Sequence, residues 1–372
     1  MSSVWLPCGD YHQYYSEDQG WWQSRFIKGK MMLLLAIVFV GIPLLSLDPD
    51  MEYWVSIATM VGYTAMGALG VQLLIGYTGL ITLGHAAFIA VGAYTSTMLV
   101  LQFPWPRFIV DWGLAYPISI LAAGIAAGLW SVLFGLPSAK VKGFYLILTT
   151  MAAQFITVDF VLTQYVSQIG GRGQAFSLPP GTIKIGPWVI DTEVKIYFVM
   201  AVLLTLMVIA LSNLLRSKPG RAWVAIRDND IAAEALGINI VWYKLLAFFV
   251  AGFFAGVAGA FWVSNTAALS PEHFPWFWSL WLVGVILIGG VGSIQGAIFG
   301  SIFMVVIMEL LQMAVIPLSE FESLEFLLID FAYIKESAFG LAICAFLIYE
   351  PNGLAYRWWQ AKNYFNLWPF SY

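Results

Sequence analysis

Charged residues are scarce in this sequence of 372 residues. Asp, Glu, Lys and Arg make up 10% of the chain, hydrophobic residues make up 60%, and the mean hydropathy is +0.82. A soluble domain carries about 25% charged and about 45–50% apolar residues, so this chain lacks the polar residues that would cover a core of this size. The composition excludes a soluble globular protein and predicts an all-α polytopic membrane protein.

Cysteine is nearly absent as well. Cys8 and Cys344 are the two cysteines, too few for a disulfide framework. We expect no bridge between them, because one precedes the first apolar segment and the other lies in the last. The first thirty residues also lack the basic, apolar, small-residue order of a signal peptide. Their Trp and Tyr residues lie beside acidic ones, which predicts an aromatic cytoplasmic tail over residues 1–30 at the membrane interface.

Sequence motifs for enzyme chemistry are missing too. No Gly-x-x-x-x-Gly-Lys-Ser/Thr phosphate loop occurs in the sequence, so any use of ATP requires another polypeptide. We find no metal-ligand cluster, nucleophile elbow or pair of catalytic carboxylates. We therefore expect a protein that is not an enzyme and that itself binds no cofactor, metal or nucleic acid.

Long apolar runs are what the sequence has instead. A membrane-spanning helix needs about 20 mostly apolar residues, and this rule gives ten candidates, with glycine-rich breaks in the third and the eighth. A re-entrant glycine-rich segment would reduce the number to eight or nine. The candidate spans are residues 31–47, 53–76, 79–101, 114–135, 143–165, 195–215, 244–264, 279–292, 296–316 and 332–349.

Lys and Arg residues are distributed unevenly between the two ends of these spans. With both termini inside, the inner segments hold twelve of the seventeen Lys and Arg residues and the outer segments hold five. This agrees with the positive-inside rule, so we expect both termini to be cytoplasmic. The predicted organisation is a tail over 1–30, a transmembrane domain over 31–350 and a cytoplasmic tail over 351–372, with an inner loop over 216–243, an outer loop over 166–194 and an acidic outer helix over 317–331.

The inner loop contains a long polar stretch, GRAWVAIRDNDIAAEALGINIVWYK (220–244). Pro219 and Gly220 are expected to end the preceding span, because proline does not continue a helix. The Asp-Asn-Asp run at 228–230 supplies side-chain oxygens for the N-cap of a new short helix. Gly237 suits the left-handed position that ends such a helix.

This short helix is predicted to have a partner. A helix of about two turns is marginal in water by itself, so it persists only where something packs on it. Ala232, Ala233 and Ala235 would form a smooth surface that a partner can approach closely, and Glu234 would project as the one charge. The alternative is a solvated connecting helix whose charges only enforce the topology.

Glycine clusters mark two places at membrane depth where helices are expected to break. Unwound backbone is tolerated there only where protein buries it or where it lines a cavity, and its N–H and C=O groups are able to bind the charged groups of a small zwitterion. The alternative is close helix packing through glycine. Both clusters contain Gly-x-x-Gly-x-Ile, a weak indication of two repeated halves. The predicted pathway residues are Gly76, Tyr77, Thr78, Gly79 and His85 in the first cluster, and Gly289, Gly290 and Gly292 in the second.

Polar residues inside the spans are further candidates for the pathway. Ionisable residues within a membrane are functional candidates by default, so we consider His85, Asp159 and Glu309, with Gln154 on the same span as Asp159. The alternative for the histidine is a neutral ring bonded to a neighbouring helix. Each acid is equally able to be structural, either hydrogen-bonded or neutralised by burial. Predicted helix contacts are the Gly-x-x-x-Gly pairs 124/128, 252/256 and 296/300.

Four stretches resemble the membrane permeases of bacterial ABC importers. They are AIRDNDIAAEALGIN (225–239) followed by YKLLAF (243–248), GYTGLITLGHAAFIAVGAY (76–94), SAKVKGFYLILTTMA (138–152) and GGVGSIQGAIFG (289–300). The first resembles the cytoplasmic coupling loop, although Glu234 and Gly237 are closer than in the general signature. Together the stretches cover most of residues 53–350 and resemble the M-type permease subunit of importers for branched-chain amino acids.

The resemblance implies a non-catalytic transport subunit in a bacterial inner membrane. Its partners would be a homologous second permease, two cytoplasmic ATPase subunits that bind ATP and Mg²⁺, and a periplasmic substrate-binding protein. The implied substrates are leucine, isoleucine, valine or related apolar amino acids, and similar permeases move urea or short amides. A self-contained secondary transporter, with Asp159 or Glu309 carrying a proton, is the alternative. The resemblance assigns ATPase coupling to Arg227, Asp230, Ala233, Glu234, Ala235 and Gly237.

Overall fold

The structure is a computed structural model of the chain. Three predictions lie wholly or partly outside the residues that it describes: the aromatic tail before Arg25, the outer loop at 167–175, 178–182 and 187, and the acidic segment 319–330 of the expected outer helix. Cys8 also lies outside them, and Cys344 is a free, exposed cysteine. The described residues are 25–48, 51–140, 143–166, 176–177, 183–186, 188–266, 268–318 and 331–367.

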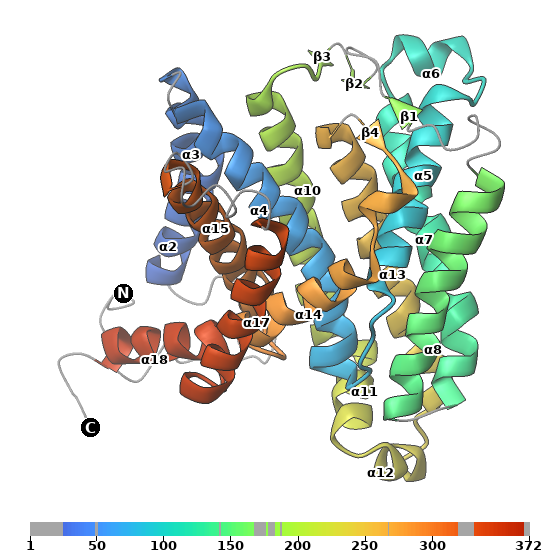
Figure 1. The fold of residues 1–372 in the computed structure, drawn as a ribbon. Coiled ribbons are helices and arrows are strands. Elements are labelled where there is room, and N and C mark those ends of the chain that lie inside the picture. The colour runs from blue at the N-terminus through green and yellow to red at the C-terminus, as the bar shows by residue number, and fades with distance from the viewer. Residues whose placement is uncertain are drawn as a thin grey trace.

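Helices make up most of the described chain, as the apolar composition predicted (Figure 1). The first half contains α2 (Arg25–Ala36), η1 (Ile37–Gly41), α3 (Ile42–Leu44), η2 (Leu45–Leu47), α4 (Glu52–Val71), η4 (Gln72–Tyr77), α5 (His85–Leu101), α6 (Arg107–Asp111), α7 (Ala115–Lys140), α8 (Phe144–Phe155) and η5 (Ile156–Val166). The second half contains β1 (Phe176–Ser177), β2 (Lys184–Ile185), β3 (Trp188–Val189), α10 (Glu193–Arg216), α11 (Lys218–Asp228), α12 (Asp230–Ala235), α13 (Ile240–Thr266), β4 (Ala268–Leu269), η6 (Pro271–His273), α14 (Trp276–Gly289), α15 (Ile294–Leu318), α17 (Phe331–Tyr349) and α18 (Gly353–Leu367).

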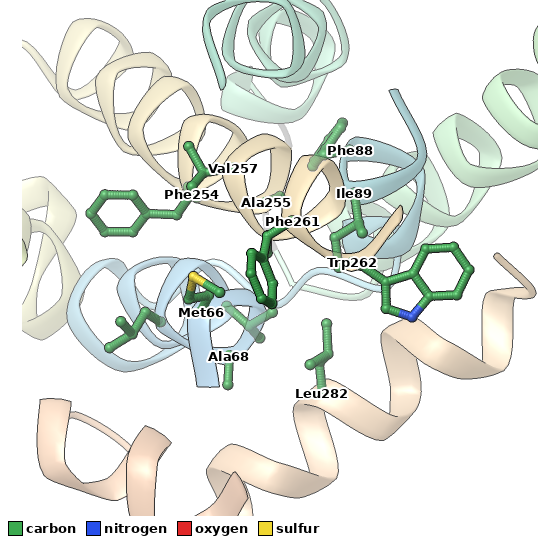
Figure 2. Close-up of a cluster of buried hydrophobic side chains, with 14 of the residues drawn as sticks. Met66, Ala68, Phe88, Ile89, Phe254, Ala255, Val257, Phe261, Trp262 and Leu282 are labelled. Atoms are coloured by element: carbon green, nitrogen blue, oxygen red, sulfur yellow. The ribbon is translucent and has the colours of Figure 1, made fainter. Parts of the chain in front are cut away.

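Helix α13 is the centre of the bundle and packs against α4, α5 and α7. Its Phe261 belongs to a buried cluster with Met66 of α4, Ile89 of α5 and Leu282 of α14, which Figure 2 shows. The predicted glycine pairs make the close contacts. A Cβ on Gly256 would lie 2.5 Å from the Ala123 carbonyl oxygen, so only glycine allows α13 and α7 to approach this closely.

The outer face of α7 shows why this bundle suits lipid rather than water. The face towards α13 carries glycine, whereas the opposite face carries leucine and isoleucine at helical spacing. These large side chains are each about half exposed, and such a stripe is favourable where the surrounding solvent is hydrocarbon. The exposed stripe consists of Leu121, Ile125, Leu129, Leu133 and Leu136.

All ten predicted apolar segments contain helix, but the number of membrane-length helices is smaller. Seven helices in the described chain are long and apolar enough to span a membrane, and α17 with α18, bent by 43°, would make an eighth. The predicted third span is shorter than expected because the glycine break keeps residues 79–84 out of α5, which has 17 residues. The first predicted span is also short, with its apolar helix at Met32–Leu44. The number ten is therefore not confirmed.

Loops and short strands collect at two opposite ends of the bundle. Figure 1 shows α12 at the bottom and α6 with the four short strands at the top. At the top, β1 pairs with β4 in antiparallel register, with Phe176 opposite Leu269, and β2 pairs with β3, with Lys184 opposite Val189. The predicted inner and outer loops thus lie at different ends. Which end faces the cytoplasm stays a prediction from the Lys and Arg distribution.

Candidate functional site

The inner loop between α10 and α13 folds into two helices. The expectation that Pro219 and Gly220 end the preceding span is wrong, because α10 ends at Arg216 and these two residues begin α11. Proline suits the first turn of a helix, where its missing N–H is not needed. Trp223 fixes α11 to the bundle, since its side chain is fully buried and its Nε1 donates a 2.8 Å hydrogen bond to the Tyr243 carbonyl.

Helix α12 is capped at both ends, as the sequence predicted. At its start, the Asn229 side-chain oxygen accepts a 3.1 Å hydrogen bond from the Ala232 amide. At its end, Gly237 has a φ of +84°, a conformation that glycine adopts without strain. The Ile238 amide donates to the Ala233 carbonyl (3.1 Å) and the Gly237 amide to the Glu234 carbonyl (2.9 Å), the bond pair of a Schellman motif. These caps fix the ends of a six-residue helix.

The exposed surface of α12 differs from the one expected. Ala233 is 2% exposed and packs inward, so the smooth alanine surface is not formed as predicted. Ile231 is 73% exposed and Leu236 is 81% exposed, and sequence reasoning missed both. Glu234 projects into solvent, as expected. The hydrophobic spacing was visible in the sequence, but a two-turn helix does not by itself indicate which side contacts the rest of the protein.

The first glycine cluster breaks a helix where the sequence predicted it. Helix α4 continues as the π-helical turn η4, which includes Gly76 and Tyr77, and regular helix resumes only at His85. The Thr78 hydroxyl donates a 2.5 Å hydrogen bond back to the Leu74 carbonyl, and the Leu80 amide donates to the same oxygen at 2.8 Å. These bonds satisfy part of the backbone that the break releases.

The second glycine cluster lies against the first. Helix α14 ends at Gly289 and α15 begins at Ile294. A Cβ on Gly76 would lie 2.6 Å from the Gly292 nitrogen, so two residues that are distant in sequence come into backbone contact. Gln72 joins the same region from inside the bundle, because its Nε2 donates to the carbonyls of Gly290 (3.1 Å) and Ser293 (2.9 Å). We call this contact region of residues 72–79 and 289–293 the glycine junction.

The inner loop reaches the glycine junction through one side chain. Arg227, in the last turn of α11, donates a 2.7 Å hydrogen bond from Nη1 to the Gly76 carbonyl. Two sets of predicted residues, the coupling loop and the glycine breaks, are therefore in direct contact. No local sequence pattern indicates this contact, because the two residues are 151 positions apart.

Of the predicted polar residues within the spans, His85 follows the first break directly but is enclosed. It begins α5, is fully buried, and stands edge-on to Phe88 with ring centroids 6.0 Å apart. A Cβ on Gly70 would lie 2.7 Å from its Nε2, so α4 passes very close to the imidazole ring. The structure places His85 in packed protein between α4 and α5. Its role in a solute pathway stays a prediction.

The remaining polar candidates lie away from the glycine junction. Gln154 is buried and its Nε2 donates a 2.9 Å hydrogen bond to the Phe274 carbonyl. Asp159 is exposed on η5, and η5 contacts η6. Glu309 is half-buried and accepts a hydrogen bond from the Tyr53 hydroxyl. Within the described chain, no group of three or more His, Cys, Asp or Glu residues is arranged to hold a metal ion.

Seven membrane-length helices in the described chain, two helix breaks in contact with each other and a capped loop helix at one end define a polytopic helical membrane protein. Comparison with known sequences gives the family. Residues 53–332 match the family described as branched-chain amino acid transport system / permease component, and the chain belongs to this family. It is a multi-pass inner-membrane protein.

The chain is similar to permeases named for branched-chain amino acid transport. It is 28% identical over 308 residues to the high-affinity permease protein LivM of Salmonella typhimurium, covering 77% of this chain and 69% of that one. It is 29% identical over 279 residues to LivM of Escherichia coli, covering 69% of this chain and 63% of the relative. The permease protein LivH of Salmonella typhimurium is 24% identical over 249 residues, or 64% of this chain and 79% of LivH. No solved structure is significantly similar to the chain.

Proposed function

We propose that this chain is the transmembrane permease subunit of an ATP-driven importer for branched-chain or related apolar amino acids. The observation that carries the proposal is α12, a capped two-turn helix whose two large apolar side chains, Ile231 and Leu236, are exposed at one end of the bundle. A helix this short is not stable alone, and exposed apolar side chains rimmed by polar residues are typical of a protein contact.

The partner at α12 is proposed to be a cytoplasmic ATPase. The sequence contains no phosphate loop, so in an ATP-driven system the nucleotide and Mg²⁺ would bind to other subunits. Two such ATPases would dock on this chain and on a homologous second permease. The similarity to both LivM and LivH, two permeases named for the same kind of transport system, supports that pairing. A periplasmic substrate-binding protein would deliver the amino acid at the end that bears the short strands.

The glycine junction is proposed to be a gate on the solute pathway. It lies at the end of the bundle that contacts the coupling loop, through Arg227. Gly76 and Gly292 are in contact through backbone atoms. Closely packed segments switch between discrete arrangements rather than deforming continuously, so a small shift would change the distance between these two backbones. Residues Gly76, Tyr77, Thr78, Gly79, Gly289, Gly290 and Gly292 would line it.

Uptake by the reconstituted complex tests this function. The chain is purified with its second permease and ATPase subunits and placed in proteoliposomes, and uptake of radiolabelled leucine is measured with binding protein and ATP. The wild-type complex is expected to accumulate leucine only with ATP. Uptake of urea or a short amide instead of leucine would change the substrate class. Uptake by this chain alone that a proton uncoupler abolishes would establish a secondary transporter instead.

Variants of α12 test the docking surface. Burial of one Leu or Ile side chain contributes about 1.5–3 kcal/mol, so the double variant Ile231→Ser, Leu236→Ser is expected to weaken ATPase binding at least about tenfold. Glu234→Arg should also reduce both assembly and ATP-driven uptake. Val241→Ser, which removes a partly exposed apolar side chain at the start of α13, is the control and should bind normally. Unchanged assembly and uptake in both α12 variants would refute the coupling role.

A further inference from the structure

The Arg227 side chain is directed away from the α12 surface that we propose for ATPase docking. Arg227 lies in the last turn of α11, two residues before the Asn229 cap, and its guanidinium extends to the glycine junction instead of to α12. Asp228 holds the other edge of the guanidinium, accepting from Nε at 3.3 Å and from Nη2 at 3.2 Å. The side chain is therefore oriented from both sides, with one nitrogen directed at the Gly76 carbonyl.

The arginine contacts both glycine breaks at once. A Cβ on Gly79 would lie 3.1 Å from Arg227 Cγ, and a Cβ on Gly292 would lie 3.4 Å from Nη1. A Cβ at Gly79 would therefore crowd the arginine, and a Cβ at Gly292 would touch it. The side chain lies between the two breaks, so α11, η4 and the turn between α14 and α15 meet at Arg227.

We propose that Arg227 is the residue that transmits movement of the coupling loop to the glycine junction. This inference rests on the proposed function, in which ATPases move α12. A single residue, Asn229, lies between α11 and α12, and Trp223 keeps α11 against α13, so displacement of α12 tilts α11 about that anchor. This tilt displaces the Arg227 guanidinium, which is hydrogen-bonded to the Gly76 carbonyl. The displacement opens or closes the contact between Gly76 and Gly292.

Arginine suits this role because its planar fork bonds a carbonyl and a carboxylate at the same time. A hydrogen bond from a charged donor changes an equilibrium by about tenfold to a hundredfold. Lysine keeps the charge but has no fork, so it should replace arginine only in part. Glutamine keeps a donor but loses both the charge and the reach.

The test compares uptake and ATP hydrolysis in the same proteoliposomes. Complexes carry Arg227→Gln, Arg227→Lys or, as a control, Arg221→Gln, which removes an exposed arginine from the same helix. We expect leucine imported per ATP hydrolysed to fall about tenfold or more in R227Q, to be partly restored in R227K and to stay at the wild-type value in R221Q. A merely structural role would reduce uptake and hydrolysis together, and an unchanged ratio in R227Q would overturn the proposal.

Spin-label distances provide a second measurement that does not depend on transport. Labels are attached at Ile81→Cys and Val291→Cys, both partly exposed and one on each break, with Cys8 and Cys344 changed to Ser. In the purified complex R227Q should broaden the distance distribution between the labels and remove its response to ATP, and R221Q should do neither. If the wild-type complex transports nothing, the proposed function is refuted. The distances alone then test whether Arg227 links the coupling loop to the glycine junction. An unchanged distribution in R227Q overturns it.

Discussion

Gly256 marks a close approach of helices in the bundle. It faces the Ala123 carbonyl and the Ala127 side chain of α7, and on its other side a Cβ on Gly92 of α5 would lie 2.3 Å from the Gly256 Cα. Three helices therefore meet around one residue without a side chain. In a membrane, where apolar burial between helices gives no advantage over lipid, such contacts are the main source of packing energy.

The residue-scale prediction is that Gly256→Ala destabilises the protein. The new methyl group would overlap the α7 backbone, and overpacking of this kind costs about 1–3 kcal/mol. The matched control is Gly340→Ala on α17, where a Cβ would meet nothing within 4 Å. Thermal unfolding in detergent, followed by tryptophan fluorescence, should show a lower midpoint for G256A. G340A should be unchanged or slightly more stable, because alanine favours helix, and equal midpoints would contradict the packing role.

Helix α12 shows how a very short element keeps its shape. Its own hydrogen bonds are too few to stabilise it, but the Asn229 side chain accepts from the Ala232 amide in its first turn, and the Schellman bonds at Gly237 and Ile238 satisfy the carbonyls of Glu234 and Ala233. Inward packing of Ala233 fixes its rotation. The element is consequently presented to a partner with Ile231 and Leu236 outward, before any partner binds.

The element-scale prediction concerns the N-cap. Asn229→Ala removes the acceptor for the Ala232 amide, a loss of about 1 kcal/mol. Hydrogen exchange at that amide should accelerate about fivefold, and ATPase binding should weaken by a similar factor. Asn229→Asp is the control, since aspartate caps as well as asparagine. Exchange that is equally slow in N229A and N229D would mean that the cap does not hold α12.

At the scale of the whole molecule, the two ends of the bundle carry different structural elements. One end carries the capped loop, Arg227 and the glycine junction, and the other carries the short strand pairs and α6 (Figure 1). Between them, helices such as α7 show leucine and isoleucine outward and glycine inward. This division suits a protein that receives a solute at one end and a mechanical input at the other.

The topology prediction follows from the uneven distribution of Lys and Arg. In a chain with Cys8 and Cys344 changed to Ser, Leu236→Cys is placed on α12 and Trp188→Cys on β3; both parent side chains are well exposed. A membrane-impermeant maleimide should label the Trp188→Cys chain in spheroplasts and the Leu236→Cys chain only in inside-out vesicles. The reverse pattern would invert the orientation, and labelling of both from one side would refute the opposition of the two ends.

For the fold, the sequence was sufficient to predict the polytopic helical class, the helical segments, the glycine breaks, the helix contacts at Gly124 and Gly256, and both caps of α12. These features depend on local composition, on helical spacing and on residue types that favour one backbone conformation. The predicted number of ten membrane spans is not confirmed, because hydropathy does not tell where a glycine-rich segment leaves the helix.

For the site, the sequence alone determined which residues were candidates, and only the tertiary structure decided which of them meet. Arg227, Gly76 and Gly292 are brought together by the packing of α11 against η4 and by the contact of η4 with the turn between α14 and α15, whereas Asp159 is exposed on η5. The same packing turned Ala233 inward and Ile231 outward. Local sequence sets the conformation of a segment, but contacts between segments depend on how distant helices fit against one another, which no single stretch of this chain encodes.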